Sequence, residues 1–124
     1  MGKLAGNYRY HDHKTSAGAT ETFVGIPVER GKIAILTYTA VCDYTTADKT
    51  LVLGIRDAGG TDHYLKVTSG VTTANGTRSS TIETDLVLLP GERPIGIIVS
   101  ASASDVCYFT AHGGLYAMDD AGAA

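Results

Sequence analysis

Two short stretches of the sequence hold residues of the kinds that bind metals or perform acid–base chemistry. The first is His-Asp-His at 11–13. If this stretch is a β-strand, His11 and His13 point to the same side, about 7 Å apart at the backbone. Two imidazoles so placed can bind a transition metal, and a structural site would need further ligands, for example His63 or His112. Because nothing in the spacing requires a metal, we expect an exposed polar edge and no metal site.

The second stretch is DAGGTD at 57–62, where two carboxylates flank a Gly-Gly pair. Asp57 and Asp62 could supply two oxygens to a calcium ion. The stretch lacks the alternating acidic ligands of an EF-hand, however, and two adjacent glycines are typical of a tight turn. We therefore predict a plain hairpin turn.

Cys42 and Cys107 are the only cysteines and lie on separate predicted strands. A disulfide between them is geometrically possible. A reducing compartment favours free thiols instead, because unpaired cysteines behave as small buried apolar residues. We expect the second arrangement.

The sequence offers no recognisable catalytic motif. No serine lies in a G-x-S-x-G elbow, and AHGGLY at 111–116 lacks the lysine and the strand-to-helix context of a phosphate-binding loop. We predict that the protein is not an enzyme, with no catalytic residue and no cofactor.

Composition narrows the remaining functions. The chain has 124 residues, the size of one domain, and a net charge of −3. Such a charge gives no broad attraction for nucleic acid or anionic lipid, and no stretch approaches the roughly 20 apolar residues of a membrane span. We expect neither nucleic acid nor membrane as a partner. Since the start has no apolar run typical of a signal peptide, Asn75-Gly76-Thr77 predicts a hairpin turn rather than a glycosylation site.

The elements that must position these residues are strands. Apolar and polar residues alternate repeatedly, with turn residues every 8–12 positions and no sustained helical period. His63, Leu65 and Val67, for example, alternate with Tyr64, Lys66 and Thr68. The predicted strands lie within 20–26, 32–42, 49–57, 62–69, 79–89, 95–102 and 105–118. We predict an all-β fold, a single antiparallel β-sandwich of about eight strands, either jelly-roll or immunoglobulin-like.

The pattern also divides the chain. Residues 1–18 are predicted to form an N-terminal arm, residues 19–118 the sandwich, and residues 119–124 a loose C-terminal tail. Tyrosine suits half-buried surfaces such as protein interfaces. Because the arm lies outside the predicted core strands, we predict that Tyr8, Tyr10, His11 and His13 contact a partner.

The second half, LPGERPIGIIVSASASDVCYFTAHGGLYAM at 89–118, resembles the closing strands of small β-sandwich structural proteins of tailed bacteriophages, and ETFVGIPVERGKIAIL at 21–36 is similar in style. The resemblance implies a non-enzymatic virion structural protein, a capsid decoration (cement) protein that binds and stabilises the assembled head. Its implied partner is the major capsid protein or another virion protein. A homo-oligomer is implied, with a trimer favoured, in a virion assembled in the host cytoplasm.

Two further expectations accompany this resemblance. The arm and the tail are the segments expected to contact the partner, so deleting residues 1–14 is predicted to weaken attachment while leaving the fold intact. The alternative function is a carbohydrate- or host-binding β-sandwich module of a phage tail or fibre.

Overall fold

The structure is a computed structural model that describes residues 3–45, 50–69 and 78–118. Within these ranges the chain forms eight strands and no helix, which confirms the all-β prediction. The strands are β1 (Leu4–Thr15), β2 (Glu21–Val24), β3 (Lys32–Thr45), β4 (Thr50–Arg56), β5 (Asp62–Ser69), β6 (Arg78–Leu88), β7 (Arg93–Val99) and β8 (Val106–Ala117). No helix capable of crossing a membrane is present among these residues.

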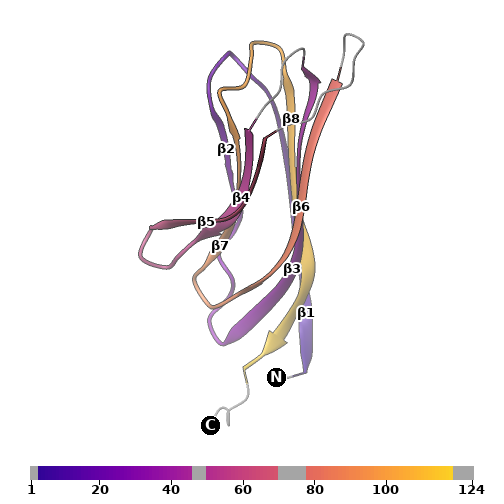
Figure 1. Cartoon of the computed structure of the whole chain (residues 1–124). Coiled ribbons are helices and arrows are strands. Elements are labelled where there is room, and N and C mark those ends of the chain that lie inside the picture. Colours follow the sequence, from indigo (N-terminus) through magenta and orange to yellow (C-terminus); the bar gives the residue numbers. More distant parts are fainter. Residues whose placement is uncertain (1–2, 46–49, 70–77, 119–124) are drawn as a thin grey trace.

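The strands form two antiparallel four-stranded sheets packed face to face (Figure 1). Sheet A has the order β1-β8-β3-β6, and sheet B has the order β2-β7-β4-β5. The pairing is nested, because β1 pairs with β8, β2 with β7, β3 with β6 and β4 with β5. This order defines an eight-stranded jelly roll, so the structure decides between the two predicted topologies.

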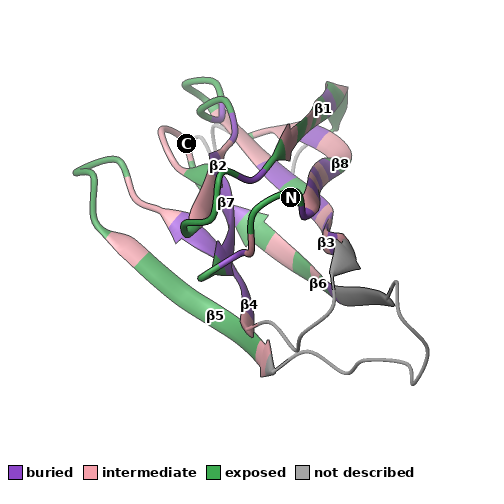
Figure 2. Ribbon diagram, turned by 90° about the horizontal axis from the view of Figure 1, so that it is seen from above, coloured by how far each residue is buried: buried purple, intermediate pink, exposed green. Residues whose placement is uncertain are grey.

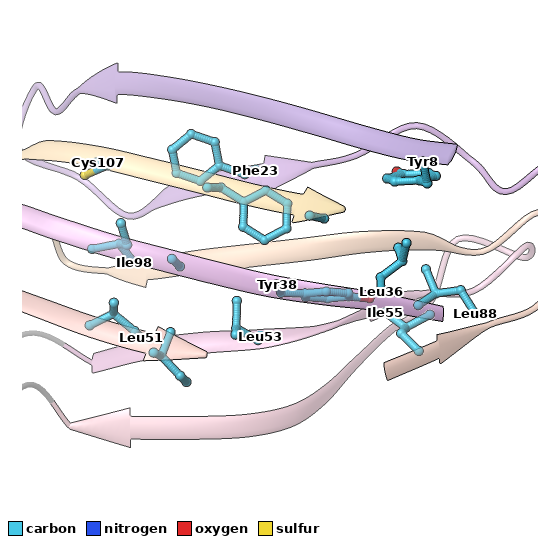
Figure 3. Close-up of a cluster of buried hydrophobic side chains, with 14 of the residues drawn as sticks. Tyr8, Phe23, Leu36, Tyr38, Leu51, Leu53, Ile55, Leu88, Ile98 and Cys107 are labelled. Carbon is cyan, nitrogen blue, oxygen red and sulfur yellow. The ribbon is translucent and has the colours of Figure 1, made fainter. Parts of the chain in front are cut away.

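The core lies between the sheets, with Phe23, Tyr38 and Leu53 among its buried side chains (Figure 3). Phe109 of β8 lies at its centre, in contact with two other rings. The Phe23 ring stacks on Phe109 at 5.9 Å, and the Tyr38 ring meets it edge-on, also at 5.9 Å. Gly96 leaves room for this ring, since a Cβ added there would lie 2.4 Å from Phe109. A glycine in the middle of β7 is therefore required by close packing.

Residues 4–15 form a strand of the sandwich rather than the predicted arm. β1 pairs with β8 over nearly its whole length, and Tyr8 is buried in the main core. The predicted boundary at residue 18 is therefore wrong, because alternate residues of this segment face the core. Deleting residues 1–14 would remove most of β1, so the structure predicts loss of the fold instead of an intact sandwich. The predicted tail at 119–124 and the predicted turn at 75–77 lie outside the described residues.

The β4–β5 hairpin leaves the body of the sandwich and projects to the left in Figure 1. Most of β5 is exposed, as the green ribbon in Figure 2 shows. A register shift between Leu53 and Gly54 separates the two halves of the β4–β5 ladder. Gly54 is needed there, since an added Cβ would lie 2.0 Å from the His63 carbonyl oxygen.

The register shift also corrects the predicted faces of β5. Tyr64 lies opposite Gly54, and Val67 lies opposite Val52, whose side chain points away from the main core. Tyr64 and Val67 therefore share the outer face of sheet B, whereas strict alternation placed them on opposite faces.

Candidate functional site

The four residues predicted to contact a partner divide between the two faces of β1. Tyr8 is only 3% exposed, and its hydroxyl donates a 2.6 Å hydrogen bond to the Ile26 carbonyl. Burial also raises the Tyr8 pKa above its ordinary value. Tyr8 is thus a core residue, and its predicted role as a surface contact is wrong. Tyr10 is half-buried, with its ring 6.0 Å from Phe109.

His11 and His13 lie on the opposite, solvent-facing side of β1. Their rings are 6.1 Å apart, which confirms that they point the same way. His63 belongs to the other sheet and does not approach them, whereas His112 lies on β8 opposite Arg9. Among the described residues, no group of three or more His, Cys, Asp or Glu side chains is placed to hold a metal ion.

The outer face of sheet A is hollowed between β1 and β8. We call this hollow the β1–β8 groove; it holds about 430 Å³. Its exposed lining side chains are those of Asn7, Arg9, His11 and His112, with Thr110 half-buried. The rest of the lining comes from Tyr8, Tyr10, Ala111 and Gly113. The His11 Nδ1 atom lies 3.1 Å from the Thr110 hydroxyl, so the two walls are linked across the strands.

The outer face of sheet B is apolar instead. Cross-strand neighbours in the register form two rows, one from Thr22 across to Val67 and one from Val24 across to Tyr64. We call the apolar members of these rows the apolar face: Val24, Val52, Tyr64, Val67, Ile95 and Ile97. Val52, Ile95 and Ile97 form a small cluster separate from the main core, with Val24 packed against it.

Val52, Ile95 and Ile97 are buried, so the exposed part of the apolar face lies at its β5 edge. Tyr64, Leu65 and Val67 are 58%, 52% and 57% exposed, and β5 is the last strand of sheet B. Edge strands present unpaired backbone groups that can bind another chain. Large exposed apolar side chains at such an edge are typical of interfaces.

Two of the four edge strands are protected by lysines from the neighbouring sheet. Lys14 of β1 donates to the Thr22 carbonyl of β2 at 2.7 Å, and Lys66 of β5 donates to the Glu83 carbonyl of β6 at 2.6 Å. Each ammonium group occupies an acceptor on the edge strand that it reaches. With one backbone acceptor occupied, β2 and β6 each have fewer free groups for strand addition, whereas Lys66 itself lies on β5, where a lysine also opposes an added strand.

The predicted turn at 57–62 closes the β4–β5 hairpin. Asp57 accepts hydrogen bonds from the backbone of Gly59 and Thr61, both at 2.9 Å, and lies 2.8 Å from His63 Nε2. Asp62 binds Arg56 through two oxygens, at 2.7 and 3.2 Å. The hydrogen bond with His63 lowers the Asp57 pKa, and the bond with Arg56 lowers the Asp62 pKa. Both carboxylates thus bind protein donors in a plain turn.

The two cysteines are buried free thiols directly opposite each other on β3 and β8. Cys42 Sγ lies 3.5 Å from a carboxylate oxygen of Asp105, which is itself buried. The hydrogen bond with Cys107, burial and this carboxylate all raise the Cys42 pKa. The same hydrogen bond lowers the Cys107 pKa. The expectation of two small buried side chains is confirmed.

Sequence reasoning missed Asn7, Arg9 and Thr110 in the groove, and Tyr64 and Val67 on the apolar face. Asn7 and Arg9 could have been found, because they alternate with Tyr8 in the same phase as His11. The residues of β5 could not, because a register shift decides their faces.

Comparison with known proteins supports the fold. No family model matches the sequence, and no curated protein matches it. Among solved structures, Xyl-CBM35 in complex with a glucuronic-acid-containing disaccharide is similar, with a TM-score of 0.50 and 20% identity over 84% of this chain and 73% of that one.

Two other similar structures come from bacteria. The Yersinia pseudotuberculosis-derived mitogen has a TM-score of 0.49 and 15% identity, covering 87% of this chain and 85% of that one. The Bacillus endospore appendage protein has a TM-score of 0.47 and 10% identity, covering 96% and 92%. At these identities the likeness concerns the β-sandwich fold alone.

Proposed function

We propose that this protein is a virion structural protein, a capsid decoration (cement) protein that binds the assembled phage head through the apolar face and the β5 edge. The observation that carries the proposal is the exposure of Tyr64, Leu65 and Val67 on an edge strand. The partner is the major capsid protein, as the resemblance to phage structural proteins implies.

The chemistry of this surface suits such a role. Main-chain pairing at an open edge gives affinity, while exposed apolar side chains supply contact area. A protein that binds the assembled shell and not its free subunits stabilises the shell by mass action. A trimer would present three such edges at once and raise the avidity of attachment.

Sedimentation of the native source material tests the assignment to a virion. The gradient fractions are analysed by mass spectrometry for this chain. We expect the chain to sediment with large particles at a fixed stoichiometry to a major shell protein. Its presence only as a free small species would contradict the proposal.

A pair of valine substitutions tests the docking surface. Val67 on β5 and Val87 on β6 are 57% and 51% exposed, each on the edge strand of a different sheet. We expect Val67→Lys to weaken rebinding to shells stripped of the native chain by about tenfold or more, and Val87→Lys to change it less than about twofold. Thermal unfolding of both variants checks that they fold. Equal binding by both variants would show that β5 is not the docking edge.

The alternative function, a carbohydrate- or host-binding module of a tail or fibre, requires a surface groove lined by polar side chains. The β1–β8 groove is the feature that favours it.

A further inference from the structure

The β1–β8 groove gathers hydrogen-bond donors without any carboxylate in its lining. Arg9 and His112 face each other across the two strands, and His11 and Thr110 form the next pair. Asn7 adds an amide at one end. The groove therefore offers the permanent positive charge of Arg9 beside two imidazoles, a hydroxyl and an amide.

Arg9, His11 and His112 differ in their partners from the basic residues of the β4–β5 hairpin. Arg56 is paired with Asp62 and His63 with Asp57, so the hairpin satisfies its own charges. Within the described part of the chain, no ion pair involves Arg9, His11 or His112, and all three are exposed. An unpaired guanidinium in a groove binds a carboxylate with two parallel hydrogen bonds.

We propose that the β1–β8 groove binds a carboxylate-bearing saccharide, with Arg9 holding the carboxylate and Asn7, Thr110 and His112 binding hydroxyl groups. The volume of about 430 Å³ is that of a small-ligand site. The amide, hydroxyl and imidazole groups of the groove can bind the several neighbouring hydroxyls of a sugar. An acidic peptide side chain has no hydroxyls and would leave these groups unused.

The edge of β1 argues against the other candidate, an acidic peptide added as a strand. The backbone N–H of His13 is already bonded to the Asp12 carboxylate at 2.8 Å. This N–H is one of the groups that an added strand would have to use, and the Asp12 charge would repel acidic side chains. The groove lies on the face of the sheet and is free of both obstacles.

The placement of the groove is compatible with the proposed docking surface. Sheets A and B pack face to face (Figure 1). Because the apolar face is on the outside of sheet B and the groove is on the outside of sheet A, the two face away from each other. A chain attached through sheet B would present the groove to the surroundings of the particle. The saccharide proposal does not depend on the docking proposal, so either one can be wrong without the other.

Calorimetry of the full chain with digalacturonic acid tests the proposal, with cellobiose as the neutral disaccharide and hexaglutamate as the acidic peptide. We expect digalacturonic acid to bind, more weakly at high salt, and cellobiose and hexaglutamate not to bind. Arg9→Gln should weaken binding about tenfold or more, because one charge-assisted contact is lost. The matched control Arg30→Gln removes an exposed arginine outside the groove and should change binding less than about twofold.

Several results would overturn the proposal. Absence of heat with digalacturonic acid at about 10 mM would exclude a site of useful affinity. Binding of hexaglutamate alone would assign the surface to an acidic peptide. Equal losses in Arg9→Gln and Arg30→Gln would show diffuse charge attraction rather than a site.

Discussion

The outer faces of the two sheets carry opposite kinds of residue, although both belong to one small sandwich. Sheet A presents Arg9, His11, Thr110 and His112 around a groove, whereas sheet B presents the apolar side chains of the β5 edge, next to the buried cluster of Val52, Ile95 and Ile97. Water solvates the first face well, so it needs no partner to be stable. Exposure of Tyr64, Leu65 and Val67 at the β5 edge is unfavourable, and a partner that covered them would gain free energy.

The same contrast distinguishes two edge strands, β1 of sheet A and β5 of sheet B, which carry Lys14 and Lys66. β1 is anchored by an aromatic side chain in the core, and β5 is exposed on both faces. The difference teaches that one edge strand can be anchored in the core while another is exposed, as Tyr8 of β1 and Tyr64 of β5 illustrate.

Those two tyrosines give the largest expected effect. Tyr8→Ala should lower the free energy of unfolding by about 3–5 kcal/mol, because it empties part of the core. Tyr64→Ala, at a side chain that is 58% exposed, should change it by less than about 0.5 kcal/mol. Urea denaturation of both variants measures the difference. Similar losses would mean that β5 is as integral to the fold as β1.

The register shift in sheet B provides the next test. Gly54→Ala places a Cβ 2.0 Å from the His63 carbonyl and should cost about 1–3 kcal/mol, because backbone must move. Gly59→Ala is the control, since its Cβ would meet only Asp57 Oδ1, at 3.4 Å. Thermal unfolding of the two variants distinguishes them. If Gly54→Ala were harmless, the β4–β5 ladder could not have the register described.

Removal of single hydroxyls sharpens the comparison within sheet A. Tyr8→Phe loses the bond to Ile26 and should cost about 1 kcal/mol. The Tyr38 hydroxyl is buried without a hydrogen-bond partner in the described structure, so Tyr38→Phe should be neutral or stabilising. Chemical denaturation provides both values, and a clear loss in Tyr38→Phe would reveal a partner for that hydroxyl.

The smallest effect concerns the pH response of the β4–β5 hairpin. The His63 hydrogen bond lowers the Asp57 pKa in the folded hairpin. The stabilisation of the turn by Asp57 is therefore present above its unfolded pKa of about 4 and is lost as the pH falls through the lower, folded pKa. NMR of the Gly59 and Thr61 amides between pH 7 and pH 2 should show the turn loosening at the acid end. In Asp57→Asn these amides should lose that pH dependence; if they kept it, another group would control the turn.

The sequence predicted the positions of the strands better than the pairing between them. Alternation in 49–57 placed Leu51, Leu53 and Ile55 on one face, and all three lie in the main core. The stretch around Tyr8 also alternates, but its charged and polar residues favoured an exposed arm. Which strands pair is decided by contacts between distant residues, so the jelly roll could not be chosen over the immunoglobulin-like order.

For the candidate surfaces, the sequence identified residues but not their combination. His11 and His13 were expected to share a side, and they do. Arg9 and His112 meet only because β1 pairs with β8 in one register. The apolar face likewise depends on three ladders in sheet B and on the shift at Gly54, none of which leaves a local pattern.

The nested pairing of the strands has a consequence for how the chain is made. β1 is translated first, but its partner β8 begins about 90 residues after β1 ends. At about 5–20 residues per second, β1 waits roughly 5–20 s on the ribosome before its ladder can form. Closing so long a loop late in synthesis makes folding slow. The apolar strands of this protein are therefore most vulnerable to aggregation while the polypeptide is still being elongated.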